Sequence, residues 1–192
     1  VLVTAFAVIN MKIFEKASDE FFDVDEADSS KEKSKKTIVT IIKRIFYTAQ
    51  DCGLAFVSIA LVLAVKKMGF SYLAAVAVVW IIIDIPSSAI LVAIYEKTGK
   101  DMTLGRSYRK AANVIYAHSK IAGGIYFVYE ATLASFWSGP DYAVIFFRDE
   151  LGTRKMMTIA LIAITIVHAF LWTAVYWSGY DDIVGLVMWL VK

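Results

Sequence analysis

The sequence predicts an all-α integral membrane protein, a four-helix transmembrane bundle with its N- and C-termini in the cytoplasm. The first observation is composition, because 59% of the 192 residues are hydrophobic, above the roughly half that is typical of globular domains. The second is distribution, because the charged residues gather in a few clusters and leave four long, nearly uncharged gaps. The third is length, because each gap supplies the roughly 20 residues that a helix needs to cross a bilayer, and none alternates as a strand would.

Residues 1–36 form the first expected element, a charged and largely disordered N-terminal segment. Within it, residues 15–36 pass from an acidic block to a basic one. This pattern is typical of interaction tails, in which Phe21 and Phe22 are candidate anchors. The sequence begins at Val1 and not at methionine. We therefore expect the apolar run VLVTAFAVINMKIF to be the end of a cleaved signal sequence, part of a span, or a segment lying on the membrane.

Residues 37–192 form the expected transmembrane bundle. Lys and Arg residues set its orientation, because the face with more of them is normally cytoplasmic. With four spans, 15 of them lie on the face of the two termini and 5 on the other face. Residues 141–155 are then expected on the outer surface, and the last residues as a short C-terminal helix in the membrane interface. The four spans are expected at about 45–65, 70–94, 121–139 and 157–178.

Three of the uncharged gaps hold an ionisable residue close to their midpoint. These residues are Asp84, Glu130 and His168, and at 1.5 Å per residue each lies within about one turn of the bilayer centre. A charged side chain at that depth costs about 3 kcal/mol or more. We therefore expect the three side chains to face one another and not lipid. Pro86, two residues after Asp84, predicts a local kink of the helix.

This arrangement predicts a site that binds an ion or a proton. We expect Asp84 and Glu130 to take up and release the proton or cation. Burial raises the pKa of a carboxyl group and a neighbouring imidazolium lowers it, so the group can titrate near neutral pH. His168 is the expected coupling partner. Asp51, about 9 Å inside the cytoplasmic edge of the first span, is the expected access residue. Helical spacing adds a supporting polar seam, made of Ser88, Tyr126 and Thr165.

Two functions follow from these observations. The first is a small polytopic membrane protein in cation- or proton-linked transport or a channel, working as an oligomer because four helices scarcely enclose a path. The alternative is a non-catalytic integral membrane subunit or scaffold of a larger complex, such as secretion or energy-converting machinery. In that alternative the buried carboxyl groups hydrogen-bond between helices and hold them in register.

An enzyme is the less favoured class. The sequence has no HExxH or GxSxG motif and no phosphate-binding glycine loop. No cofactor is expected, and a metal bound by Asp84, Glu130 and His168 stays a third hypothesis. Cys52 is the only cysteine, which excludes an intrachain disulfide and a cysteine metal cluster.

The expected partners follow from charge and hydropathy. A net charge of only +2 gives no indication of nucleic-acid binding. The expected partners are the lipid bilayer, with anionic lipid at the basic cytoplasmic face, and copies of the chain or other membrane subunits. The lack of disulfides and of long soluble domains favours the bacterial inner membrane as the location.

Overall fold

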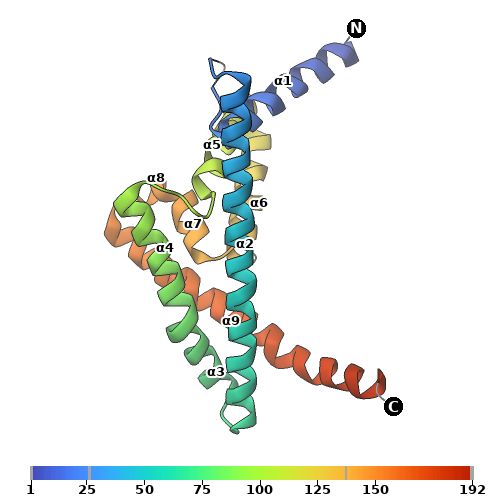
Figure 1. The fold of residues 1–192 in the computed structure, drawn as a ribbon, viewed down its shortest axis with the longest axis vertical. Helices are drawn as coiled ribbons and strands as arrows, with labels where there is room; N and C mark the ends of the chain where they lie inside the picture. Colours follow the sequence, from blue (N-terminus) through green and yellow to red (C-terminus); the bar gives the residue numbers. More distant parts are fainter. Residues whose placement is uncertain (1, 26, 137, 191–192) are drawn as a thin grey trace.

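The computed structural model of the chain describes residues 2–25, 27–136 and 138–190, and the side chains of residues 12–25, 27–133 and 138–179. Every described element is helical, which confirms the all-α fold class (Figure 1). The segments α3, η1 and α4 follow one another without a break and form one continuous helix. The elements are α1 (Leu2–Phe22), α2 (Ser30–Lys67), α3 (Tyr72–Val79), η1 (Trp80–Asp84), α4 (Ile85–Thr98), α5 (Gly105–His118), α6 (Lys120–Phe136), α7 (Pro140–Phe146), α8 (Arg148–Leu151) and α9 (Arg154–Leu190).

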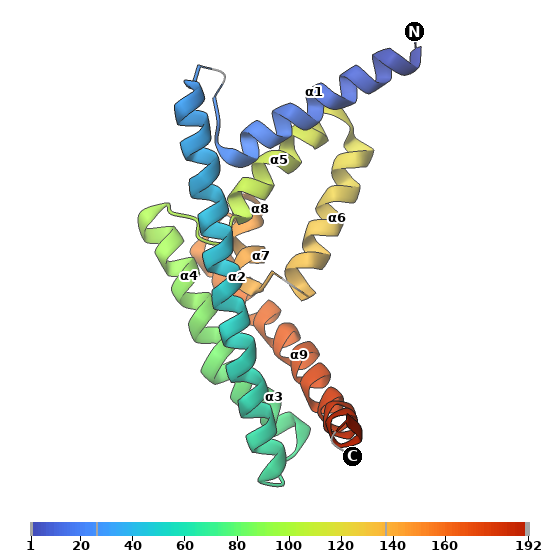
Figure 2. The same ribbon diagram turned by 45° about the vertical axis from the view of Figure 1, so that its right-hand side comes forward.

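Three helices in the described part of the chain are long and apolar enough to cross a membrane. They are Ser30–Lys67, Tyr72–Thr98 and Arg154–Gly179, and they correspond to the first, second and fourth expected spans. Figure 2 shows α2 and the continuous α3–η1–α4 helix running side by side along the long axis, with α9 crossing below α7. Their length and hydropathy indicate a membrane location.

The expected third span, at 121–139, is not among these helices. The helix α6 has only 17 residues and ends at Phe136. The chain then turns at Gly139, whose φ of +85° suits glycine, and Pro140 starts α7. All seven residues of α7 are buried. The segment that the sequence placed on the outer surface therefore begins in the middle of the molecule.

Ion pairs join two connections that the four-span arrangement put on opposite faces. Glu96, at the end of α4, lies 2.9 Å from Nε of Arg148 and 3.3 Å from Nε of Arg154. Arg109 of α5 pairs with Glu150 of α8 in the same region. These contacts are incompatible with about 30 Å of hydrocarbon between the two connections.

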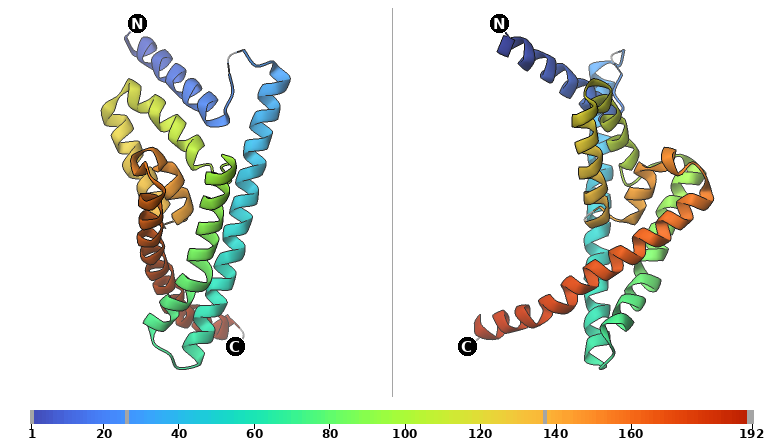
Figure 3. Two further views of the ribbon diagram at one scale, coloured as in Figure 1. Left: turned by 90° about the vertical axis from the view of Figure 1, so that its left-hand side faces the viewer. Right: turned by 180° about the vertical axis from the view of Figure 1, so that it is seen from behind.

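Four spans would place both termini on one face of the membrane. The start of α2 and the end of α9 lie toward opposite ends of the long axis (Figure 3). The helix α9 also continues to Leu190 without a break, so the expected short C-terminal helix is part of it. The reason is the turn after α6, which brings the chain back to the side from which α6 started.

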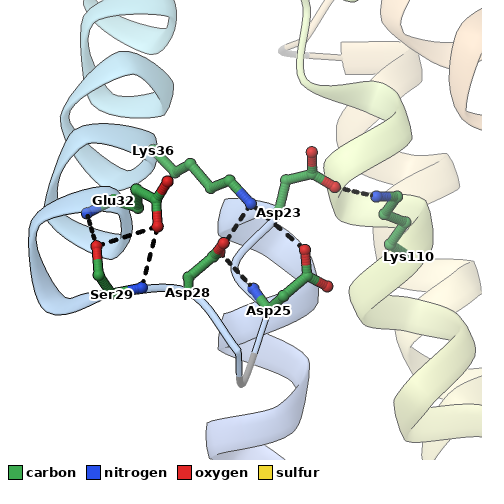
Figure 4. Close-up of polar contacts among 7 residues, drawn as sticks. All are labelled: Asp23, Asp25, Asp28, Ser29, Glu32, Lys36 and Lys110. Atoms are coloured by element: carbon green, nitrogen blue, oxygen red, sulfur yellow. Dashed lines mark hydrogen bonds and ion pairs between the residues drawn. The ribbon is translucent and has the colours of Figure 1, made fainter.

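Helix occupies most of the charged N-terminal segment, and its expected disorder stays a prediction. Residues 15–25 and 27–36 include the end of α1 and the start of α2 (Figure 4). Ser29 and Glu32 form a capping box at the start of α2, with hydrogen bonds of 3.3 and 3.1 Å. Nζ of Lys36 lies 2.7 Å from Oδ2 of Asp28, and this hydrogen bond lowers the pKa of the Asp28 carboxyl.

The helix α1 is docked on α5 (Figure 2). Lys110 of α5 pairs with Asp23 just after α1, and this hydrogen bond lowers the pKa of the Asp23 carboxyl. The ring of Phe21 meets that of Tyr108 edge to face at 4.8 Å. Phe21, a candidate anchor for a partner, thus makes a contact within the chain itself.

One cluster of buried apolar residues lies around α7. Tyr142, Ala143 and Phe146 of this helix pack with Ala112 of α5. Gly105 allows the close approach of α5, because a Cβ atom there would lie 2.9 Å from the carbonyl oxygen of Tyr142. The buried helix therefore holds α4, α5, α6 and α9 together and positions the side chains described below.

Candidate functional site

A cavity of about 360 Å³ lies where α2, η1, α4, α7 and α9 meet. Five acidic or basic side chains from four elements line it, namely Arg44 and Asp51 of α2, Asp84 of η1, Asp141 of α7 and His168 of α9. Charges interact more strongly in such surroundings than in water because the effective dielectric constant is lower. Polar residues such as Thr48 and Ser58 and apolar residues such as Leu54 complete the wall.

Asp84 and His168 contact each other in this cavity, as the sequence predicts. Asp84 is only 6% exposed, and its Oδ2 lies 3.2 Å from Nδ1 of His168. A neutral imidazole with its proton on Nδ1 donates a hydrogen bond to the carboxylate, whereas a protonated one forms an ion pair with it. The pair can therefore hold one proton or two without a change of partners.

The helix around Asp84 is distorted in a specific way. Residues Trp80–Asp84 form a π-helical turn, in which the N–H of Ile85 donates to the carbonyl of Trp80, five residues earlier. Pro86 follows, and its ring would clash with the carbonyl four residues before it in a regular α-helix. The expected kink thus takes the form of a widened turn, a feature that is frequent at functional sites. The Ser87 hydroxyl donates to the carbonyl of Ile83 at 2.6 Å.

Asp141 is held by hydrogen bonds from two spans. The hydroxyl of Tyr47 lies 2.9 Å from Oδ2 of Asp141 and 2.5 Å from the carbonyl oxygen of Ser138. The Ser88 hydroxyl donates to Oδ1 of Asp141 at 3.3 Å. A tyrosine hydroxyl has one proton. When the Tyr47 hydroxyl donates this proton to the carbonyl of Ser138, it cannot also donate to Asp141. The contact with Asp141 is then a hydrogen bond only if the Asp141 carboxyl carries a proton and donates it to the tyrosine oxygen.

The protonation of Asp141 is favoured by its surroundings. Burial raises the pKa of the carboxyl from 3.8 to about 6, against the hydrogen bonds from Tyr47 and Ser88, which lower it. Asp141 belongs to α7, outside the three candidate spans. Its geometry and its pKa both suit a carboxyl group that exchanges a proton close to neutral pH.

Sequence reasoning missed Asp141 and Arg44 as site residues. Asp141 lies just after the expected third span, and Arg44 lies just before the expected first one. A signal for Asp141 was present in the preceding Gly139–Pro140 pair, which is a turn signal inside an apolar region. Nη1 of Arg44 is buried and has no hydrogen-bond partner among the described residues.

Glu130 lies apart from the cavity, contrary to prediction. It is 2% exposed and accepts a hydrogen bond from the hydroxyl of Tyr142 in α7. The predicted seam is divided in the same way. Tyr126 also hydrogen-bonds to Glu130, whereas Thr165 accepts from Nε1 of Trp80 at 3.0 Å. Ser88 alone of the predicted seam lines the cavity.

The separation of Glu130 bears on the metal hypothesis. Its carboxylate is not one of the groups in the cavity with Asp84 and His168. Among the residues that the structure describes, no three His, Cys, Asp or Glu side chains are arranged as ligands of one metal ion.

Comparisons of the chain with models of known protein families, with curated proteins and with solved structures found no match.

Proposed function

We propose that this chain is a membrane protein of three spans that acts in cation- or proton-linked transport or as a channel. The observation that carries the proposal is the convergence of three carboxyl groups and one imidazole, from four helical segments, on one cavity. Asp84 and His168 are the proposed binding pair, Asp141 the second protonation group and Asp51 the access residue. Intramembrane ionisable groups that face a cavity are typical of ion and proton pathways.

The charges in the cavity support a positively charged ligand. With a neutral imidazole and all three carboxyl groups ionised, the charges of Asp51, Asp84, Asp141 and Arg44 give a lining charge of −2, from three negative charges and one positive charge. Binding a proton or a cation reduces the repulsion between the negatively charged carboxylates. A volume of about 360 Å³ also has room for a small cation with several waters, since one water takes up about 30 Å³.

We propose an orientation in which α1, α5 and α8 lie on the cytoplasmic side. The ion pairs between Glu96, Arg148 and Arg154 support three spans, because they join connections on one face. With three spans, 17 of the 20 Lys and Arg residues lie on the side of the α2 start. Four spans would place only 15 of them on one side. The positive-inside rule therefore favours the arrangement with three spans. The bacterial inner membrane is the proposed location.

The substitution Asp84→Asn tests this function. The purified full chain is reconstituted in vesicles that contain a pH-sensitive dye, and proton flux is measured after a step in external pH, with and without Na⁺ or K⁺. We expect flux in the native chain and at least about a tenfold loss in the variant, because asparagine keeps the shape but binds no proton. Glu15→Gln is the matched control, because Glu15 is an exposed carboxylate on α1, far from the cavity.

A melting curve of each variant separates a transport site from a structural hydrogen bond. Transport predicts lost flux at an unchanged melting temperature. A structural role predicts a lower melting temperature, because His168 then loses a buried charged partner. Full flux in the Asp84→Asn variant would contradict the proposed role of Asp84.

A second candidate function is a non-catalytic subunit of a larger membrane complex. Ile121, Ile125 and Val128 of α6 are 79, 67 and 68% exposed, and they repeat along one face of the helix. Such a face suits lipid, a second copy of the chain or another subunit. Native mass spectrometry of particles extracted in mild detergent distinguishes these partners. Stoichiometric foreign chains favour the subunit, whereas copies of this chain alone favour the independent channel or transporter.

A further inference from the structure

A second cavity, of about 500 Å³, lies beside the end of α4 and has a different chemistry. It is bounded by α4, α5, α7, α8 and the start of α9. Four arginines line it, together with the carboxylates of Glu96 and Asp149 and the ring of Tyr95. Four positive and two negative charges give the lining an excess of two positive charges. The arginines are Arg106, Arg109, Arg148 and Arg154.

Carboxylates hold part of this cluster in place. Glu96 binds both Arg148 and Arg154, and it is the carboxylate that brings α8 and α9 to the end of α4. Arg106 differs, since its side chain makes no ion pair or hydrogen bond among the described residues, and it is exposed. A guanidinium group with free N–H groups at the edge of a basic cavity is available to an incoming anion.

Arg109 shows unused hydrogen-bonding capacity in the same wall. Its guanidinium group packs on the rings of Phe127 and Phe146, with its carbon 4.6 and 5.6 Å from the ring centres. One nitrogen pairs with Glu150. Nε and Nη1 are buried and have no hydrogen-bond partner in the described part of the chain. A buried donor without a partner destabilises a protein, and an oxygen-rich ligand would supply the missing acceptor.

We propose that this arginine cavity binds the phosphate group of an anionic lipid headgroup. Phosphate matches the chemistry because arginine donates paired, parallel N–H groups to its oxygens. A lipid matches the location because the cavity lies at the end of a candidate span, beside an interfacial tyrosine, Tyr95. Ile90 and Ile94 of the same helix are 59 and 38% exposed and offer apolar surface for acyl chains. The inference is independent of whether the carboxylate cavity moves a cation.

Lipid retention by the full chain tests this site. The protein is reconstituted in nanodiscs of phosphatidylcholine with a quarter phosphatidylglycerol, and retained lipids are counted by native mass spectrometry. We expect Arg106→Gln to weaken retention of phosphatidylglycerol by about tenfold, the size of one lost charged hydrogen bond. Lys35→Gln is the matched control, because Lys35 is an exposed cation on the same side and outside the cavity. Neither substitution removes a buried contact, so both variants keep the fold.

Three outcomes are distinguished. Selective loss of phosphatidylglycerol in the Arg106→Gln variant, with no competition by millimolar inorganic phosphate, supports the lipid site. Equal retention by the Arg106→Gln and Lys35→Gln variants overturns the arginine cavity as the site. Binding of inorganic phosphate with no preference between the two lipids overturns the lipid as its source and leaves a free phosphate ligand.

Discussion

Replacing Asp141 with asparagine changes how the stability of the protein depends on pH. Burial raises the pKa of this carboxyl from 3.8 to about 6. Between about pH 4 and about pH 6, the folded protein keeps a proton on Asp141 that the unfolded chain has already released. The free energy of unfolding therefore falls as pH rises from about 4, and the loss is complete above the folded pKa. Asparagine does not titrate, so the variant lacks this part of the pH dependence.

The size of the effect follows from the shift in pKa. Each pKa unit corresponds to about 1.4 kcal/mol, so a shift of about two units amounts to about 3 kcal/mol between pH 4 and pH 7. Asp141 is 5% exposed, so solvent screening does not remove most of this energy. Other ionisable groups around the cavity, Arg44, Asp51, Asp84 and His168, are present in both proteins. Comparing the two pH profiles therefore isolates Asp141 to first approximation.

The assay is unfolding in detergent, measured for both proteins at half-unit steps of pH from 4 to 7. We expect the native chain to lose about 3 kcal/mol of stability more than the variant over this range, with most of the change below about pH 6. Parallel profiles for the two proteins would show that the pKa of Asp141 is not raised in the folded state, and the reasoning from its burial would be refuted.

Two further predictions concern the buried glutamate and the topology. Tyr142→Phe removes a donor to the buried carboxyl of Glu130 and should lower the free energy of unfolding by about 1–3 kcal/mol. The matched control, Tyr129→Phe on an exposed face of α6, should change this free energy little. Equal effects of the two substitutions would contradict the structural role of the contact between Tyr142 and Glu130. A protease-sensitive tag after Lys100 should be protected in intact cells, whereas one after Lys192 should be cleaved from outside. Protection of both tags would favour four spans.

Local sequence patterns predicted much of the helical structure. Runs of about 20 apolar residues correspond to the three candidate spans, because hydropathy and length are properties of consecutive residues. The distance from each flanking charge predicted similar depths for Asp84 and His168 on different helices, and the structure shows the two side chains in contact. Pro86 predicted the distorted turn, because its ring and missing N–H act on the adjacent backbone.

The position of a residue along a helix does not determine which face of the helix its side chain occupies. It also does not determine which other helix packs against that face. Glu130 has the same expected depth as Asp84, yet its partner is Tyr142, because α7 returns through the bundle beside α6. The N-terminal segment is a similar case. Its charge blocks are those of a disordered tail, but Lys110, from far along the chain, supplies a partner for Asp23.

The sequence by itself determined that the protein is helical, that it carries hydrophobic runs long enough to span a membrane, and that carboxyl groups and a histidine lie within them. Only the tertiary structure decided which of these groups meet, that α7 is buried, and that Arg148 lies beside Glu96. The physical reason is that helix formation and hydropathy depend on neighbours within one or two turns. The pairing of charges and the burial of the short helix α7 depend instead on long-range contacts, which exist only once the chain has folded.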